Sequence, residues 1–458
     1  MTSTPAPPSP SGPKLWTTGT LVYTTAGLVV LFGWLLLGDF AWQLKERSVT
    51  ATAQLFLRNF GASDFFVGLL VGSVPGALGM LLVPVISVRS DRHRGRWGRR
   101  IPFLLIPMPF VAVSMAGLAV APLIGTQIHH WLGEGSPGLN VCVLGTFAAF
   151  WGVFEVFAIM ANAVFGGLIN DVVPHAVIGR FFGLFRIVSL VDGIIFNFLI
   201  IKHVEGNFFW VFLGTGLVYS IGFAVMCLRV KEGEYPPPEP LSETSRPGRF
   251  QSLRAYFREC YTTPFYLWVF VATILCALSF NPVNAFSIFF AKSLGMTMEI
   301  YGRYIAASYV VSLALAYFIG SLADRFHPLR LGIVAMFFYA GISLWGAAFA
   351  TDPQRFGFAF IAHTIISGIY LTSMASIGQR LYPKLKFAQF ASAAGLLLAT
   401  CTAMLPPGMG LLLDASHHNY RLTFLVSGIL ATLGLIALLV VHQQFLKLGG
   451  PKNYVAPH

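Results

Sequence analysis

The sequence alternates between long apolar runs and short polar connections. A membrane-spanning helix needs about 20 mostly apolar residues, and twelve runs are long enough. We expect spanning helices at approximately 24–57, 64–88, 101–124, 141–169, 181–202, 208–228, 265–290, 300–323, 329–350, 355–379, 387–413 and 422–446. Because β-barrel strands would be shorter and would alternate in polarity, the predicted fold class is an all-α membrane protein with twelve transmembrane helices.

One polar connection, residues 229–263, is much longer than the others. Its stretch "EYPPPEPLSETSRPGRF" is too polar to pack a core, which predicts a flexible cytoplasmic linker. The linker separates an N-terminal six-helix bundle at 17–228 from a C-terminal six-helix bundle at 264–447. Residues 1–16 are rich in Pro and Ser and are predicted to be a disordered cytoplasmic tail, and 448–458 form a second cytoplasmic tail.

The two predicted bundles share short internal repeats. "SDR" at 90–92 follows the second helix, and "GSLADRFHPLR" at 320–330 follows the eighth. A second repeat places Pro174 and Pro383 at matching positions after the fourth and tenth helices. Repeats at half the chain length are typical of transporters built from two related bundles with a binding site between them. We therefore expect two pseudo-symmetric bundles.

Composition and charge agree with this class. The chain of 458 residues is 56% hydrophobic and 10% charged, with a mean hydropathy of +0.71, unlike a soluble domain. The net charge is +12, and six arginines fall within 89–100. Basic residues gather in cytoplasmic loops of membrane proteins, so we expect an inner- or plasma-membrane protein with both termini cytoplasmic and no nucleic-acid partner. The five cysteines form no CxxC pair, and we expect no metal or cofactor.

An Asp-Arg pair recurs at the two repeats, as Asp91-Arg92 and as Asp324-Arg325. Such a carboxylate can pair with Arg99 or Arg100 nearby and can cap a neighbouring helix. We interpret these residues as a conformational latch that holds a bundle in one state of the transport cycle. The alternative is a solvated loop whose arginines only set the topology.

The same residues carry a family resemblance. "GSLADR" resembles the loop motif of the major facilitator superfamily, with Gly320 and Asp324 at the Gly and Asp positions of the motif and Ser87 replacing that Gly in the first half. The stretches "LLLGDFAWQL" (35–44), "RNFGAS" (58–63) and "SDRHRGRWGRRIPF" (90–103) resemble the glycoside–pentoside–hexuronide:cation symporters, and the last is also similar to plant-type sucrose transporters.

This resemblance implies alternating access and sugar uptake driven by a cation. It also implies a sugar-contacting role for Asp39, which falls on the family's first-helix "GD" aspartate. Sodium-using members carry acidic residues in the second helix, upstream of the proline that Pro84 matches. Here the stretch "VGSVPGALGMLLVP" has none, and we therefore expect proton coupling.

The first helix carries the richest polar stretch, "GDFAWQLKERSVTATAQ" at 38–54. Residues 45–47 either begin an external loop or continue the helix, and the apolar run at 48–57 favours continuation. On a continuous helix Asp39, Gln43, Glu46 and Thr50 share one stripe, with Arg47 at its margin. This mixture of donors and acceptors suits a sugar. Trp42 either stacks on the sugar or packs within the bundle.

Further polar residues fall inside the predicted spans, where charges are costly. Glu155 in the fourth helix and Asp192 in the fifth are candidate proton carriers, as is Asp39; the alternative for Glu155 and Asp192 is a structural pair with Arg47 or Arg186. Asn162 shares the face of Glu155. Asn281 and Asn284 flank Pro282, which marks either a gating break or an ordinary kink, and His363 contacts the substrate or bonds another helix.

Enzyme motifs are absent from the sequence: it has no HExxH, no Walker loop and no GxSxG with suitable partners. We predict a monomeric secondary transporter, not an enzyme, that carries a sugar or glycoside by proton symport within the lipid bilayer. One alternative is an exporter of amphipathic or drug-like compounds. Another is a transporter-shaped sensor that binds a ligand without moving it.

Overall fold

A computed structural model describes residues 15–174, 177–235, 258, 260–383 and 387–457. Within these residues, eleven helices are long and apolar enough to cross a membrane. A twelfth long helix, α13 (Met298–Phe326), lies among them. The predicted all-α fold with two six-helix bundles is confirmed.

The N-terminal half contains six spans, three of them built from consecutive helical segments. They are α1 (Thr25–Asn59); α2 (Asp64–Val67), η1 (Gly68–Ser73) and α3 (Val74–Arg92); α4 (Ile101–Leu105) and α5 (Pro107–Leu132); α6 (Leu139–Val172); α7 (Ile178–Ile195), η4 (Phe196–Ile200) and α8 (Ile201–Val204); and α9 (Phe208–Arg229).

The C-terminal half contains the other six spans and two short helices. Besides α13, they are α11 (Pro264–Ser279) with α12 (Asn281–Ser293), α14 (Pro328–Phe349), α15 (Pro353–Met374), α16 (Ile377–Leu381), α17 (Phe387–Ala415), α18 (Arg421–Lys447) and α19 (Gly450–Asn453). The break between α11 and α12 falls at Phe280, directly before the Asn281-Pro282 pair.

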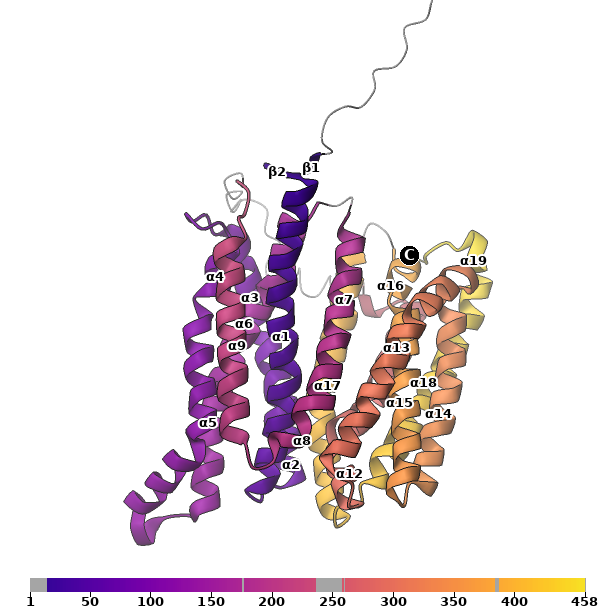
Figure 1. The fold of residues 1–458 in the computed structure, drawn as a ribbon. Helices are drawn as coiled ribbons and strands as arrows, with labels where there is room; N and C mark the ends of the chain where they lie inside the picture. Colours follow the sequence, from indigo (N-terminus) through magenta and orange to yellow (C-terminus); the bar gives the residue numbers. More distant parts are fainter. Residues whose placement is uncertain (1–14, 175–176, 236–257, 259, 384–386, 458) are drawn as a thin grey trace, which may run out of the picture.

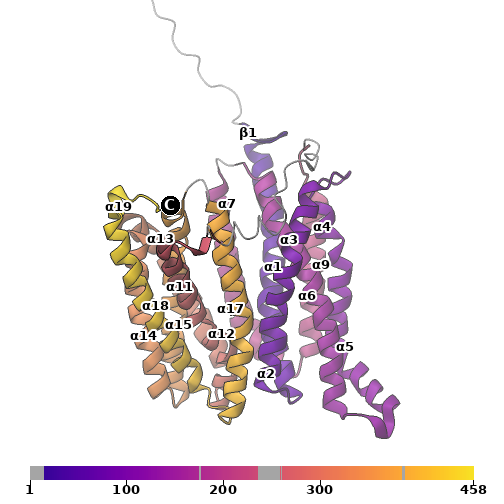
Figure 2. The ribbon, with the colours of Figure 1, turned by 180° about the vertical axis from the view of Figure 1, so that it is seen from behind.

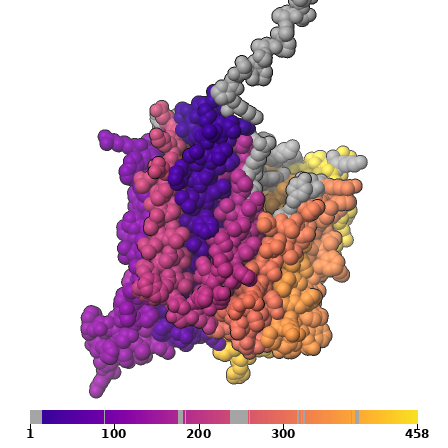
Figure 3. Space-filling model, in the orientation of Figure 1, coloured from indigo at the N-terminus to yellow at the C-terminus, as the bar shows by residue number. Residues whose placement is uncertain are grey.

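The two halves lie side by side, with α4, α5 and α9 on the outer flank of the first half and α14 and α18 on that of the second (Figures 1 and 2). Figure 3 shows the same division on the surface. Strand β1 (Leu15–Thr18) and the C-terminal segment lie at one end of the molecule, which we call the terminal end. The opposite end, where α1 meets α2, is called the distal end.

The first residues described differ from the predicted tail. Leu15–Thr18 (β1) and Leu21–Thr24 (β2) pair antiparallel in a hairpin, with Leu15 opposite Thr24. The prediction of a disordered 1–16 is therefore wrong for Leu15 and Trp16. The available signal was a run of β-branched and aromatic residues on both sides of Gly19. Thr24 also caps α1, because its side chain accepts a hydrogen bond from the Gly27 backbone.

The third and fourth spans are longer than predicted at the distal end. The prediction ended the third span at residue 124, but α5 continues to Leu132, and α6 begins at Leu139. No helix-breaking pair interrupts 126–132, and the helix stops where Gly133 adopts a φ of 52°. The resulting helical extension projects beyond the other helices (Figure 1).

A stripe of glycines closes the two halves against each other near the distal end. A Cβ on Gly68 would lie 2.5 Å from the Pro406 carbonyl oxygen, and one on Gly72 would lie 2.7 Å from Pro406 Cβ. On the same helix, Gly76 faces Ala403. Small residues at four-residue spacing let two helices pack closely, and this stripe does so here. It joins the second helix to α17 of the other half.

Candidate functional site: a polar cavity between the halves

Helix α1 is continuous through Lys45, Glu46 and Arg47, which settles the choice left open by the sequence. The three side chains then point in different directions. Lys45 is 2% exposed, and its ammonium lies 4.2 Å from the centre of the Trp42 ring inside the N-terminal half. It pairs with the neighbouring Glu46 carboxylate, whose side chain is 47% exposed. The helix therefore keeps one cation inside its own bundle and turns Glu46 outward.

A cavity of about 270 Å³ lies where Glu46 and Arg47 point. Both halves of the chain line it. The N-terminal half contributes Glu46, Arg47, Thr50, Ala51, Gln54, Phe196, Asn197 and Ile201, and the C-terminal half contributes Asn284, Ser287, Ile288, Tyr301, Ile305, Tyr309, Phe360 and Thr364. A carboxylate, a guanidinium, amides and hydroxyls thus surround one space, with aromatic rings at its sides. Such a wall can both donate to and accept from a polar solute.

Arg47 connects the two halves across this cavity. Its Nη1 donates to the Tyr309 hydroxyl of α13 at 2.8 Å, and its guanidinium carbon lies 4.8 Å from the centre of that ring. On the other side, Nη2 donates to the Ser189 carbonyl oxygen of α7 at 3.1 Å. One side chain therefore holds α1, α7 and α13 together.

Asp192 is the carboxylate nearest to Arg47, with 3.9 Å between Oδ2 and Nε. Its side chain is fully buried, and neither oxygen has a hydrogen-bond partner in the described part of the chain. Asp192 and Arg47 therefore form the ion pair that was predicted as the alternative, but their separation is too long for a hydrogen bond. A buried charge held this loosely is costly in a membrane, which keeps Asp192 a candidate proton carrier.

Asn284 is held in place by a buried relay in the C-terminal half. Its Oδ1 lies 3.0 Å from His363 Nε2, and His363 Nδ1 lies 2.8 Å from the Tyr339 hydroxyl. His363 is fully buried and does not line the cavity. It therefore positions Asn284 through an interhelical hydrogen bond. Asn284 also borders a second cavity of about 240 Å³, next to Asn281, Thr50 and Gln54.

The remaining predicted substrate and proton residues lie away from both cavities. Asp39 is fully buried and accepts a hydrogen bond from Gln43 Nε2 at 3.2 Å. Trp42 is 8% exposed and packs on Phe165, Tyr219 and Phe223 within the N-terminal half. Glu155 is half-buried on α6, and Asn162 is exposed on the same helix. Their roles in binding and coupling stay predictions.

The predicted latch residues of the first half form a charge cluster at the terminal end. Arg99 makes a two-pronged contact with Asp171 at the end of α6, with Nε–Oδ2 at 2.9 Å and Nη2–Oδ1 at 2.5 Å. Arg100 pairs with both Asp91 and Asp171. The hydrogen bond to Asp171 raises the pKa of Arg99 above its usual value. All of these partners lie in the N-terminal half, so in this conformation the cluster ties α3, α4 and α6 together.

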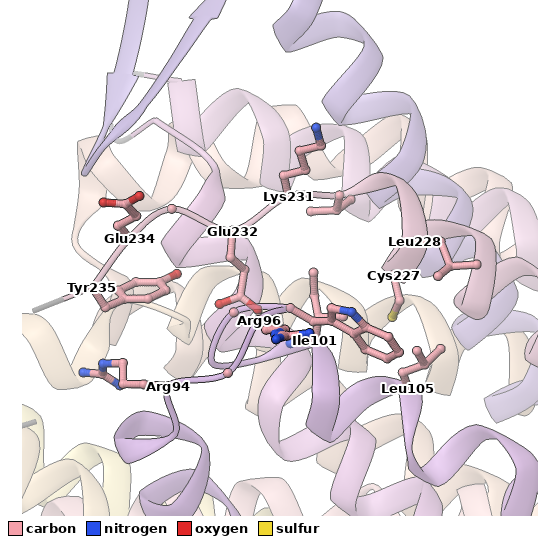
Figure 4. Close-up of a pocket in the computed structure, with 15 residues that line it drawn as sticks. Arg94, Arg96, Ile101, Leu105, Cys227, Leu228, Lys231, Glu232, Glu234 and Tyr235 are labelled. Carbon is pink, nitrogen blue, oxygen red and sulfur yellow. The ribbon is translucent and has the colours of Figure 1, made fainter. Parts of the chain in front are cut away.

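The helix cap expected of Asp91 is instead supplied by Glu232, just after α9. Glu232 accepts hydrogen bonds from the backbone N–H groups of Arg99, Arg100 and Ile101 at 2.7–2.9 Å. Figure 4 shows its carboxylate turned toward the loop that carries Arg96. Gly98 has a φ of 95°, and a Cβ there would lie 2.5 Å from Glu232 Cδ, so this close approach requires glycine.

The latch residues of the second half are less fully described. The Asp324 side chain lies outside the described residues. Arg325 is exposed, and its guanidinium carbon lies 5.5 Å from the centre of the Phe326 ring. In the first half, Arg92 is exposed in the last turn of α3.

A second polar cluster joins the two halves at the distal end, and the sequence analysis missed it. The Asp414 carboxylate of α17 accepts hydrogen bonds from the backbone N–H groups of Asp64 and Phe65 at 3.0 and 2.9 Å. The fully buried Asp64 carboxylate lies 2.7 Å from His418 Nδ1 and accepts from the Tyr420 hydroxyl. We call Arg58, Asp64, Asp414, His418 and Tyr420 the distal cluster.

Asp64, Asp414 and His418 have the donor atoms of a metal site, within 4.8 Å of one another. Their atoms are already occupied, however. Asp414 caps the start of α2, and Arg58 lies 3.5 Å from Asp64. A divalent cation would have to displace these contacts and approach a guanidinium, so the cluster is better suited to closing the distal end than to holding a metal.

Comparison with known families agrees with this architecture. The sequence profile described as "Major Facilitator Superfamily" matches residues 35–400, most of the chain. The chain belongs to the Major Facilitator Superfamily. It is therefore a multi-pass membrane transporter. No curated protein is similar enough in sequence to count as a relative.

Several solved structures share this transporter fold at low sequence identity. One is a bacterial homologue of the human lysosomal transporter Spinster, in an inward-facing and occupied conformation, with 15% sequence identity. The match covers 94% of this chain and 98% of that protein, with a TM-score of 0.64. A D-xylose–proton symporter is 13% identical, with 93% and 97% coverage and a TM-score of 0.61. A bacterial homologue of the iron transporter ferroportin is 16% identical, with 90% and 99% coverage and a TM-score of 0.61.

Proposed function

We propose that this chain is a secondary active transporter that carries a sugar or glycoside together with a proton. The observation that carries the proposal is the polar cavity between the halves, where Glu46, Arg47 and Asn284 come together from both bundles. A hydroxyl-rich solute needs donors and acceptors at once, and this wall supplies both. A site shared between the two bundles is also what alternating access requires.

Two further observations support a polar, ring-shaped substrate. Phe196 and Phe360 border the cavity from opposite halves and offer flat apolar faces beside the hydrogen-bonding groups. The D-xylose–proton symporter has the same fold.

Proton coupling is proposed to act through Asp192 and Arg47. Asp192 is buried without hydrogen bonds, and Arg47 is shared between Asp192 and Tyr309 of the other half. When Asp192 takes up a proton, Arg47 loses its ionic partner. The contacts of Arg47 with Tyr309 and with the substrate then become stronger relative to its contact with Asp192. Protonation and the approach of the two halves are thereby linked. Glu155 on α6 is the second candidate for the carrier.

The proposed orientation places the terminal end in the cytoplasm. The arginine-rich loop at 93–100 lies at that end, together with Lys231 and the C-terminal segment, and basic loops are retained on the cytoplasmic side. The glycine contacts and the distal cluster close the opposite end, which favours an inward-facing state. In this orientation a substrate leaves the cavity toward the cytoplasm.

A thermal-shift screen of the purified transporter tests the substrate class. Monosaccharides, glycosides and lipophilic cations are compared at two pH values, and at least one sugar or glycoside should raise the melting temperature more strongly at the lower pH. Asn284→Ala should weaken that ligand about tenfold, because one direct hydrogen bond is lost. The matched control, Asn419→Ala, removes an exposed amide at the distal end and should leave the affinity unchanged. Stabilisation by lipophilic cations alone would instead support the exporter alternative.

A further inference from the structure

A separate basic cavity of about 620 Å³ opens at the terminal end of the C-terminal half. It lies between the turn that joins α13 to α14, the short helix α16, and the end of α18 with α19. The side chains that define its chemistry are Arg325, Phe326, His327, Arg330, Arg380 and Leu446.

The cavity is strongly positive. Three guanidinium groups line it, and none of the described lining residues has a carboxylate. Arg325 and Arg330 are exposed, and neither has an ion-pair partner within the described part of the chain. Burial, and then the positive charges of Arg380 and Arg330, lower the pKa of His327 to about 4. The positive charges of the lining arginines favour an anion in the cavity.

The cavity also lies at the level where lipid headgroups are found. Arg325 lies in the last turn of α13 and Arg330 in the first turn of α14, so both arginines sit at the ends of long helices, and α18 ends beside them at Lys447. Beside them, Phe326 and Leu446 are 46% and 48% exposed. Apolar side chains exposed at a span end face acyl chains, while the arginines next to them face the phosphate layer.

The cavity in Figure 4 occupies the equivalent place in the N-terminal half, beside the loop after the second helix and the end of the sixth. Its volume is similar, about 700 Å³, and it is lined by Arg94, Arg96 and Lys231. It differs in also containing the carboxylates of Glu232 and Glu234, which offset part of the positive charge. This counterpart provides an internal control with similar volume and a smaller net positive charge.

We propose that the basic cavity formed by Arg325, Arg330 and Arg380 binds the phosphate-bearing headgroup of an anionic phospholipid. The planar guanidinium groups match phosphate oxygens in two-pronged hydrogen bonds. Phe326 and Leu446 contact the first carbons of the acyl chains. The bound lipid bridges the α13–α14 turn and the end of α18, so it joins segments that are distant in sequence.

The test is equilibrium binding of short-chain lipids to the purified full-length transporter, measured by native mass spectrometry. Dioctanoyl phosphatidylglycerol should bind more tightly than dioctanoyl phosphatidylcholine. Arg325→Ala with Arg330→Ala should weaken phosphatidylglycerol binding about 30-fold, because each basic side chain near an anionic headgroup contributes about fivefold. Arg325→Lys with Arg330→Lys keeps the charges and should recover most of the affinity.

Three outcomes would overturn the proposal. One is equal binding of the two lipids, which would mean that charge is not recognised. Another concerns the double variant Arg96→Ala with Lys231→Ala. If it loses as much phosphatidylglycerol affinity as the Arg325→Ala, Arg330→Ala variant, or more, the lipid binds in the cavity of Figure 4. The third is full competition by inorganic phosphate, which would identify the ligand as a soluble anion. Unchanged melting temperatures in the absence of lipid confirm that the alanine variants are folded.

Discussion

Asp414→Asn should open the distal end of the transporter. The Asp414 carboxylate accepts two backbone hydrogen bonds from the start of α2 in the other half, at 3.0 and 2.9 Å. An asparagine keeps one acceptor oxygen and presents an amide to the second N–H. A hydrogen bond to a charged group contributes about 2 kcal/mol, so the closed distal end should lose about 30-fold in relative population. A distal-open state populated at about 1% would rise to about a quarter.

Spin labels at Glu134 and Thr351 measure this change, because both positions are exposed at the distal end and lie in different halves. In Asp414→Asn the distance distribution should gain a longer component. The matched control is Asp352→Asn. Asp352 also caps a helix, accepting from the Gln354 and Arg355 backbone at 3.1 and 2.9 Å, but its contacts stay within the C-terminal half. If Asp414→Asn gave the same distances as Asp352→Asn, the distal cluster would not hold the halves together.

Asp192→Asn should remove the pH dependence of uptake while leaving substrate exchange intact, because the buried carboxylate beside Arg47 is lost. If Asp192→Asn and Glu155→Gln both accumulate substrate normally across pH, neither carboxylate carries the proton. Glu232→Gln should lower the melting temperature, because the Glu232 carboxylate accepts three backbone hydrogen bonds at the start of α4; the exposed Glu234→Gln serves as control, and equal melting temperatures would contradict the cap. His327 has a pKa lowered to about 4, so the unfolded chain takes up its proton first and stability should fall as pH drops from about 6.5 toward 4. His327→Gln should flatten that part of an acid-unfolding curve, and an unchanged curve would show that His327 is not involved.

Hydropathy alone was enough to predict the number and order of the spans, because only helices satisfy their backbone hydrogen bonds in lipid. Helix continuation through residues 45–47 followed from the apolar run after them. The predicted stripe was only partly informative. Glu46 and Arg47 reach the cavity, whereas Asp39 is buried inside the N-terminal half, because a shared face on one helix does not say which neighbour covers each turn.

The contacts between distant segments were beyond sequence reasoning. Asp64 and Asp414 are 350 positions apart, and each looks like an ordinary loop residue until the fold brings them together. Asp171 and Glu232 were missed for the same reason, although both flank helix ends where a carboxylate can act as a cap. A polar residue within a few positions of a span end was the available signal, and it did not identify the partner.

We propose that the cavity between the halves carries a polyhydroxylated solute together with a proton. Uptake of a radiolabelled sugar, chosen by the thermal-shift screen, into liposomes containing the purified transporter tests it most directly. With the interior alkaline, the sugar should accumulate above its external concentration, and a protonophore should collapse that accumulation. Uptake that only reaches the external concentration, and is the same with and without the proton gradient, would contradict the account.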